Sequence, residues 1–261
     1  MRHIALVTLA KGSQVTRWAI TALAATMLAA PVGAQATSGD GYLFGQPLGT
    51  LTVRAGFAQP FASSDLFNYT TNLLSLRRRD FGGAEFGVDV GFMQGRRLEW
   101  LISADVSSRT SGSDYRNFVG SDGLPIEQQT TFVRVPLMFG ARYWLTPPGT
   151  NIGKLAWVPS RIAPFVAVQG GVMWYEFHQS GDFVNFSAGN SVFAGDLTSN
   201  GWAPTAALSA GVAITLNPHF SLLTQGRYIY ANKTLSADFT GFQPIDLSGL
   251  SMTVGLAYRM R

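Results

Sequence analysis

The sequence contains no cysteine, and charged residues make up only 13% of its 261 positions. The lack of cysteine excludes a disulfide framework and thiol chemistry. Soluble domains carry about a quarter of charged residues, so this composition is a poor one for a surface in water. After residue 36, no apolar run approaches the roughly 18 residues that a membrane-spanning helix needs. A water-soluble domain and a helical membrane anchor are therefore both poorly supported.

The first 36 residues are organised like a secretory signal peptide. An apolar segment at 18–30 is followed by small residues that allow cleavage after Ala34 or Ala36. Three basic residues precede it: Arg2, Lys11 and Arg17. Removing this segment lowers the formal net charge from +4 to +1, so the pI of 9.6 is no evidence for nucleic-acid binding. We expect an exported chain with no nucleic-acid partner.

Apolar and polar residues alternate along eight segments of the remaining chain. In FGGAEFGVDVGFM, residues 81–93, Phe86 and Val88 fall on one face, whereas Glu85 and Asp89 fall on the other. The same alternation recurs at 51–58, 99–107, 133–143, 166–172, 208–215, 220–230 and 250–259. A period of two is typical of β-strands whose faces meet different environments.

The connections between these segments differ in length on the two sides. Four are long and polar: 60–80, 109–128, 178–200 and 231–247. Two are short turns, 94–97 and 217–219, and the connection 145–163 is rich in proline. Ser63, Ser64 and Asp65 are placed to begin a short helix in the first long connection. Aromatic residues gather in two bands, toward the short turns (Phe92, Trp100, Tyr143, Trp157, Phe220, Tyr258) and toward the long loops (Phe57, Phe81, Phe132, Trp174, Trp202, Tyr230).

Alternating strands of about ten residues, one-sided long loops and two aromatic bands are typical of transmembrane β-barrels. We therefore predict an all-β fold, a transmembrane antiparallel up-and-down barrel of eight strands. Ten strands stay possible if 145–163 or 183–194 forms another hairpin. The predicted organisation is a signal peptide at 1–36, a short periplasmic segment at 37–48 and a barrel domain at 49–261.

The pattern over residues 49–261 resembles the small eight-stranded outer-membrane barrels of the OmpX and OmpW kind. Thr253-x-Gly255-x-x-Tyr258-x-Met260 resembles the terminal strand signal read by the barrel-assembly machinery, although Met260 and Arg261 stand where a final aromatic is usual. The resemblance implies a monomer in a bacterial outer membrane, in contact with lipid and lipopolysaccharide and without a cofactor.

The polar faces of the strands predict a charged barrel interior. An eight-stranded barrel is only wide enough for side chains, and arginine satisfies carboxylates there because of its planar fork. We expect a lumen charge network that closes the bore, made of Arg54, Glu85, Asp89, Glu99, Asp105, Arg134, Arg142, Arg227 and Arg259. A catalytic pair of Glu85 and Asp89 is disfavoured, because four residues along a strand span roughly 13 Å.

Two surface features have both a structural and a functional interpretation. Arg77, Arg78 and Arg79 either form a solvated loop end beside Asp80 or contact lipopolysaccharide phosphates. His178-Gln179-Ser180 resembles the His-x-Ser of outer-membrane lipid A deacylases, but the sequence offers no acid to orient the histidine, since Asp196 lies deep in the loop. The three histidines are scattered, so no metal site is expected.

Three functions remain open. A structural or surface-interaction role through the long loops needs nothing beyond these features, and we expect no enzyme activity. A conduit for small hydrophobic molecules, as in OmpW-like barrels, needs an apolar patch in the lumen, for which Leu101, Met138, Met173 and Leu223 are candidates. A lipid A-modifying esterase would use His178 and Ser180.

Overall fold

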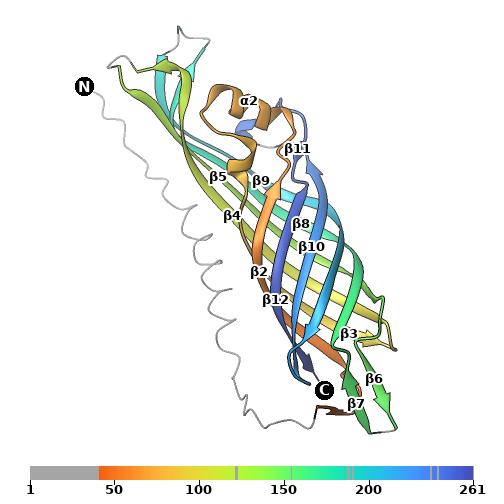
Figure 1. Cartoon of the computed structure of the whole chain (residues 1–261). Helices are drawn as coiled ribbons and strands as arrows, with labels where there is room; N and C mark the ends of the chain where they lie inside the picture. The colour runs from red at the N-terminus through yellow and green to blue at the C-terminus, as the bar shows by residue number, and fades with distance from the viewer. Residues whose placement is uncertain are drawn as a thin grey trace, which may run out of the picture. The chain divides into compact units, whose positions relative to one another are not determined.

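The computed structural model describes residues 41–260 except 121, 122, 154, 187, 188, 190, 236 and 240. The predicted signal peptide, 1–36, lies outside the described residues. Eight long antiparallel strands form a closed ring in which each pairs with its neighbours along the chain (Figure 1). They are β2 (Gly49–Pro60), β3 (Gly83–Gln94), β4 (Leu98–Val119), β5 (Pro125–Trp144), β8 (Ile162–Asn185), β9 (Ser191–Thr215), β10 (Phe220–Lys233) and β12 (Gly249–Met260). The predicted eight-stranded barrel is therefore confirmed.

Closure of the ring follows from two ladders that join its beginning to its end. Strand β12 pairs with β2 from Gly249↔Pro60 to Met260↔Gly49. Strand β10 pairs with both β12 and β9, so no barrel strand is left with an open edge over its central part. A closed barrel satisfies backbone hydrogen bonds without water, as a lipid environment requires.

We call the end of the barrel that carries the short β3–β4 and β9–β10 connections the turn end. The proline-rich connection 145–163 forms the hairpin of β6 (Gly149–Ile152) and β7 (Ala156–Pro159) there. β7 also pairs with β1 (Leu43–Phe44), so these three strands form a separate small sheet outside the barrel ring. The possible extra hairpin at 145–163 thus exists, but it adds no strand to the barrel.

We call the opposite end the loop end. The prediction that 109–128 and 178–200 are loops at this end is wrong. Strands β4 and β5 continue to a narrow tip between Val119 and Pro125, and β8 and β9 continue to Asn185↔Ser191. β5 and β8 stay paired as far as Gln128↔Gly181. The four strands thus form a sheet, the protruding sheet, that extends past the barrel rim (Figure 1). Polar residues such as His178, Gln179 and Ser180 stand on both of its faces, so alternation of apolar residues does not mark it in the sequence.

The remaining loop-end segments fold over the barrel mouth. The first long loop contains α2 (Asp65–Leu73), with Ser64 as N-cap as the sequence predicts, and η1 (Arg78–Phe81). The last loop contains η2 (Ala237–Phe239) and β11 (Ile245–Asp246), which pairs with β10. Among the residues that the structure describes, no helix is long and apolar enough to cross a membrane.

Candidate functional site: the barrel interior

The outward-facing side chains of the barrel strands are apolar and open to the surroundings. Met252, Leu208 and Val168 are exposed by 75%, 60% and 58%. The inward-facing side chains include buried arginines and carboxylates, which is the reverse of the arrangement found in water-soluble proteins. An apolar exterior around a polar interior is what lipid-facing strands require. The chain is a transmembrane β-barrel.

The predicted aromatic bands exist only in part. Among the residues that do lie on the exterior, Trp100, Tyr143 and Tyr258 are exposed toward the turn end, and Phe57, Trp202 and Tyr230 toward the loop end. Three of the aromatic residues expected in the bands are instead buried: Phe81, Phe132 and Trp157. Phe132 lies on an inward position of β5, and Phe81 and Trp157 belong to segments outside the barrel ladder. The prediction that these three residues belong to the exterior bands is therefore wrong.

Seven charged side chains meet inside the barrel, and we call them the ionic cluster: Arg54, Glu85, Asp89, Glu99, Asp105, Arg142 and Arg227. All of them are buried. Arg54 is at the centre, because its Nε and Nη2 donate to the two oxygens of Asp89 at 3.0 and 2.9 Å. Its Nη2 also lies 2.7 Å from Asp105. This forked contact is the geometry in which arginine binds a carboxylate most strongly.

Arg227 connects opposite parts of the ring through the lumen. Its Nη1 donates to Asp105 and its Nη2 to Glu85, both at 2.7 Å. The two carboxylates stand on β4 and β3, whereas Arg227 stands on β10. These ion pairs therefore cross the bore and do not follow a ladder.

The cluster extends toward the turn end through Arg142 and Glu99. Arg142 Nη1 donates to Glu99 at 3.0 Å, and Trp144 Nε1 donates to the same oxygen at 3.1 Å. The hydroxyl of Thr50 donates to the other oxygen of Glu99. Arg142 also lies 3.7 Å from Asp89, which joins this group to Arg54.

Two of the nine residues expected in the lumen charge network lie apart from the cluster. Arg134 and Arg259 are buried, but neither has a carboxylate within 4.0 Å in the described part of the chain. Arg134 donates to the carbonyl of Leu247 at 3.0 Å. Arg259 donates to the carbonyls of Asn217 and Pro218, both at 3.0 Å.

Glycines on the inward face of β3 leave the space that these carboxylates occupy. A methyl group at Gly87 would collide with the Asp105 carboxylate, and one at Gly91 would collide with Glu99. Carboxylates of β4 thus lie against these glycines, and the Arg54 guanidinium lies next to Gly87.

Toward the loop end the barrel mouth is filled by apolar side chains, which we call the apolar plug. Phe67 of α2 packs on Phe81, Phe132 and Phe177 with ring centroids 4.8 to 5.7 Å apart. The buried members of the plug are Ala62, Leu66, Phe67, Leu74, Leu76, Phe81, Phe132, Met138, Met173, Tyr175, Phe177, Ala203, Ala207, Ile229, Ala231, Leu235, Phe239, Ile245 and Leu247. The loop segments thus cover the mouth with a hydrophobic core of their own, which no periodicity in the sequence shows.

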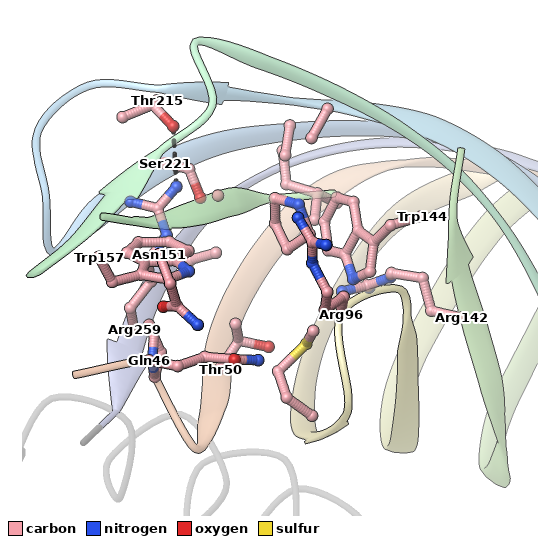
Figure 2. A pocket seen from close by; sticks show the side chains of 18 residues that line it. Gln46, Thr50, Arg96, Arg142, Trp144, Asn151, Trp157, Thr215, Ser221 and Arg259 are labelled. Carbon is pink, nitrogen blue, oxygen red and sulfur yellow. Dashed lines mark hydrogen bonds between the residues drawn. The ribbon is translucent and has the colours of Figure 1, made fainter. Parts of the chain in front are cut away.

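At the turn end a second apolar group lies beside an open pocket, which Arg142 of the ionic cluster also lines. Trp144 and Phe165 pack edge to face at 5.3 Å, together with Ala163, Ala213 and Leu223. Beyond them lies the turn-end pocket, which Figure 2 shows with Arg142 and Trp144 on one side and Arg259 and Trp157 on the other. The sequence did not indicate this pocket, because its rim includes the β6–β7 hairpin, which was only one alternative for 145–163 and was considered only as an addition to the barrel.

The three arginines at 77–79 lie on the outer surface of the first long loop. Arg78 donates to the side chain of Asn68 at 2.7 Å, and Arg79 is 3.9 Å from Asp80. The Asp80 carboxylate accepts from the backbone of Arg77 at 2.8 Å, so it serves chiefly to cap the beginning of η1. Most of this positive charge is therefore free to meet an external anion.

The expectation that no acid can reach His178 is wrong. His178 and Ser180 lie on the outward face of β8, and Asp196 lies on β9, which is a strand here and not a loop. The His178 Nε2 is 2.7 Å from the Asp196 carboxylate, and Ser180 is the ladder partner of Asp196. No hydrogen bond joins Ser180 to His178 within the described residues.

Comparisons with known proteins find similarity only among solved structures. No family model matches the chain, and no curated protein matches it. The outer membrane protein OprG from Pseudomonas aeruginosa is 13% identical with a TM-score of 0.43, over 84% of this chain and 99% of that one. Neisserial surface protein A is 14% identical with a TM-score of 0.42, over 81% and 96%. A major outer membrane protein from Thermus thermophilus is 13% identical with a TM-score of 0.42, over 81% and 99%. These are small outer-membrane barrels, the class that the sequence resembles.

Proposed function

We propose that this protein is a closed barrel of the outer membrane that acts through its external face as a surface-interaction protein, without catalytic activity. The proposal has two parts, a lumen that passes no solute and an external sheet that meets a partner. The observation that carries it is the protruding sheet, which continues far beyond the membrane-spanning part.

Three groups of side chains fill the bore at successive levels, and they support closure. The apolar plug lies toward the loop end, the ionic cluster joins β2, β3, β4, β5 and β10 across the middle, and Trp144 with Phe165 lies toward the turn end. The charged groups are paired and buried, so water has little access to them. A solute would have to break these ion pairs to pass.

The external part is supported by the length and the tip of the protruding sheet. The β8–β9 ladder continues for eleven residue pairs beyond the aromatic pair Trp174↔Trp202, or roughly 36 Å along the strands. Apolar side chains remain open near the tips, where Val119 is exposed by 66% and Leu124 by 61%. Phe118 of one hairpin packs against Phe186 of the other at 5.3 Å. Such an apolar surface outside a membrane is typical of a protein contact.

Two measurements test the two parts separately. Purified protein in a planar bilayer should show no steady large conductance, and such a conductance would refute closure. Cells that express the protein should attach to a protein-coated surface more than control cells do. The variant Val119→Ser/Leu124→Ser/Phe186→Ser should lose most of this gain, whereas unchanged attachment by this variant would refute the role of the tip.

A conduit for small hydrophobic molecules is the second candidate, and one observation favours it. Pro136 interrupts the β4–β5 ladder, whose pairing stops at Ala104↔Leu137 and resumes at Ser107↔Arg134. Met138 and Met173 belong to the apolar plug, and Leu101 and Leu223 are also buried. The conduit would therefore require these methionines to move, and uptake of a hydrophobic dye that depends on Met138 would support it.

An esterase at His178 is the third candidate, favoured by the contact with Asp196. Ser180 lines an open polar hollow of about 520 Å³ beside Gln128 and Glu127, but His178 does not line it. A serine nucleophile needs its base within hydrogen-bond reach, which is why we rank this function last. Mass spectrometry of lipid A from expressing cells tests it, with His178→Ala and Ser180→Ala as controls for any loss of an acyl chain.

A further inference from the structure

The turn-end pocket has the form of a binding site at the opposite end of the barrel from the protruding sheet. It is bounded by the start of β2, by the ends of β5 and β12, and by strands β6 and β7 of the small sheet. Its inner side is closed by Trp144, Ala163, Ala213 and Leu223, which belong to the second apolar group. The pocket is therefore a blind recess and not part of a passage.

The charge of the lining is one-sided. The eighteen residues that line the pocket include three arginines, Arg96, Arg142 and Arg259, and no aspartate or glutamate. Arg142 is compensated from behind by Glu99, which does not line the pocket. Arg96 is exposed and has no ion pair in the described part of the chain, and Arg259 is buried without one. Among the described residues, the recess is thus positive and has no acid to supply the counter-charge that a buried cation requires.

The guanidinium group of Arg259 is held in place but is not neutralised by an acid within the described residues. Arg259 donates only to uncharged acceptors, namely two backbone carbonyls and the hydroxyl of Thr215 at 2.8 Å. Its guanidinium lies over the Trp157 ring at 5.5 Å, which fixes its plane (Figure 2). The Nε of Arg142 is buried and has no hydrogen-bond partner among the described residues. Gly149 allows the Trp157 ring to lie there, because a methyl group at position 149 would collide with it.

The size of the recess limits what can enter. Its volume is about 40 Å³, room for a few waters or a small charged group, but not for a sugar or a lipid chain. Gln46 and Asn151 supply amide groups at its rim, so a longer molecule could remain outside with only its charged end inserted. Charge and size together select a small oxyanion.

We propose that the turn-end pocket binds a small oxyanion, a carboxylate or phosphate group carried by a molecule on the periplasmic side. Arg259 and Arg96 supply the positive charge, Trp157 holds Arg259 in place, and the amides of Gln46 and Asn151 contact the rest of the ligand. The site is independent of the surface-interaction role, because it lies at the other end of a closed lumen.

Binding is tested on the full protein, purified from membranes in detergent. Acetate and inorganic phosphate are titrated separately at constant ionic strength, and the tryptophan fluorescence is recorded, since Trp144 and Trp157 line the pocket. Saturable binding of acetate alone would identify a carboxylate site, and of phosphate alone a phosphate site; either result supports the proposal. Absence of saturable binding of both anions up to about 10 mM would overturn it.

Matched variants locate the binding. Arg259→Gln should weaken it by about tenfold or more, because charge-assisted hydrogen bonds are lost. Arg161→Gln removes the same charge from an exposed arginine at the same end that does not line the pocket, and it should bind as the wild type does. If Arg259→Gln does not fold, as judged by a gel mobility that changes on boiling, Arg96→Gln at an exposed position replaces it. We expect this variant to bind the anion several-fold more weakly. Equal affinity of the wild type and the folded pocket variant would overturn the proposal.

Discussion

Replacing Arg54 by methionine removes the central cation of the ionic cluster while keeping a side chain of comparable length. In the wild type, three guanidinium groups face four carboxylates, so the cluster carries one excess negative charge. The variant leaves two arginines for the same four acids. Asp89 loses both short contacts with Arg54, and the one arginine of the cluster that still lies near it is Arg142 at 3.7 Å.

Breaking a buried ion pair by removing one partner costs about 3 to 5 kcal/mol, because the remaining charge stays buried without compensation. We expect a loss of this size in the free energy of unfolding, measured by urea titration of the protein refolded into lipid vesicles. The exposed Arg109→Met is the matched control and should change it by less than about 0.5 kcal/mol.

The double variant Arg54→Met/Asp89→Asn restores the original balance, with two arginines and three acids. Its loss in the free energy of unfolding should be smaller than the sum of the losses of Arg54→Met and Asp89→Asn. The difference, which is the coupling energy, should be about 1 to 3 kcal/mol. Two results would refute the view that these charges are paired and shielded from water. One is a loss of less than about 1 kcal/mol in the free energy of unfolding for Arg54→Met. The other is a double variant whose loss equals the sum of the losses of the two single variants.

Other parts of the interior give further expected outcomes. Gly87→Ala should lower stability by about 1 to 3 kcal/mol, because the added methyl collides with the Asp105 carboxylate, whereas Gly226→Ala has open space around it and should cost far less in the same urea titration. Phe67→Ala should cost about 3 to 5 kcal/mol by leaving a cavity in the apolar plug, yet a planar bilayer should still show no steady conductance because the ionic cluster remains. Replacing Arg77, Arg78 and Arg79 together by glutamine should leave stability in detergent nearly unchanged but reduce the thermal stabilisation that added lipopolysaccharide gives; equal stabilisation of variant and wild type would rule out a phosphate contact there.

The barrel could be predicted because lipid imposes the same rule on every spanning strand. Segments such as 81–93 and 250–259 alternate strictly, since one face must be apolar and the other must fill a narrow bore. That rule ends at the membrane surface. Above it, β8 continues through Glu176, His178 and Ser180 with polar residues on its outer face, so its continuation was taken for a loop. Asp196 was misplaced for the same reason.

Inside the barrel, the sequence indicates which residues share the bore but not which of them meet. Arg134 and Arg142 have equivalent positions in the alternation of β5, yet only Arg142 contacts the acids. The difference arises because the loop segments bring Leu247 to Arg134, and nothing local in the sequence specifies that approach. The turn-end pocket depends in the same way on the pairing of β1 with β7, which joins segments more than a hundred residues apart.

The position of Arg227 bears on the order in which the protein can assemble. All four acids of the ionic cluster stand on β3 and β4, and the strands from β2 to β5 supply only Arg54 and Arg142 against them. A half-formed sheet of these strands holds the four acids with only two arginines of the cluster, and the third arginine of the cluster arrives with β10. A slip of β10 by one residue would turn Arg227 toward lipid and leave Glu85 and Asp105 without it. Closure in the correct register is thus the step that brings Arg227 to Glu85 and Asp105, so ion pairing itself favours the finished ring over its incomplete precursors.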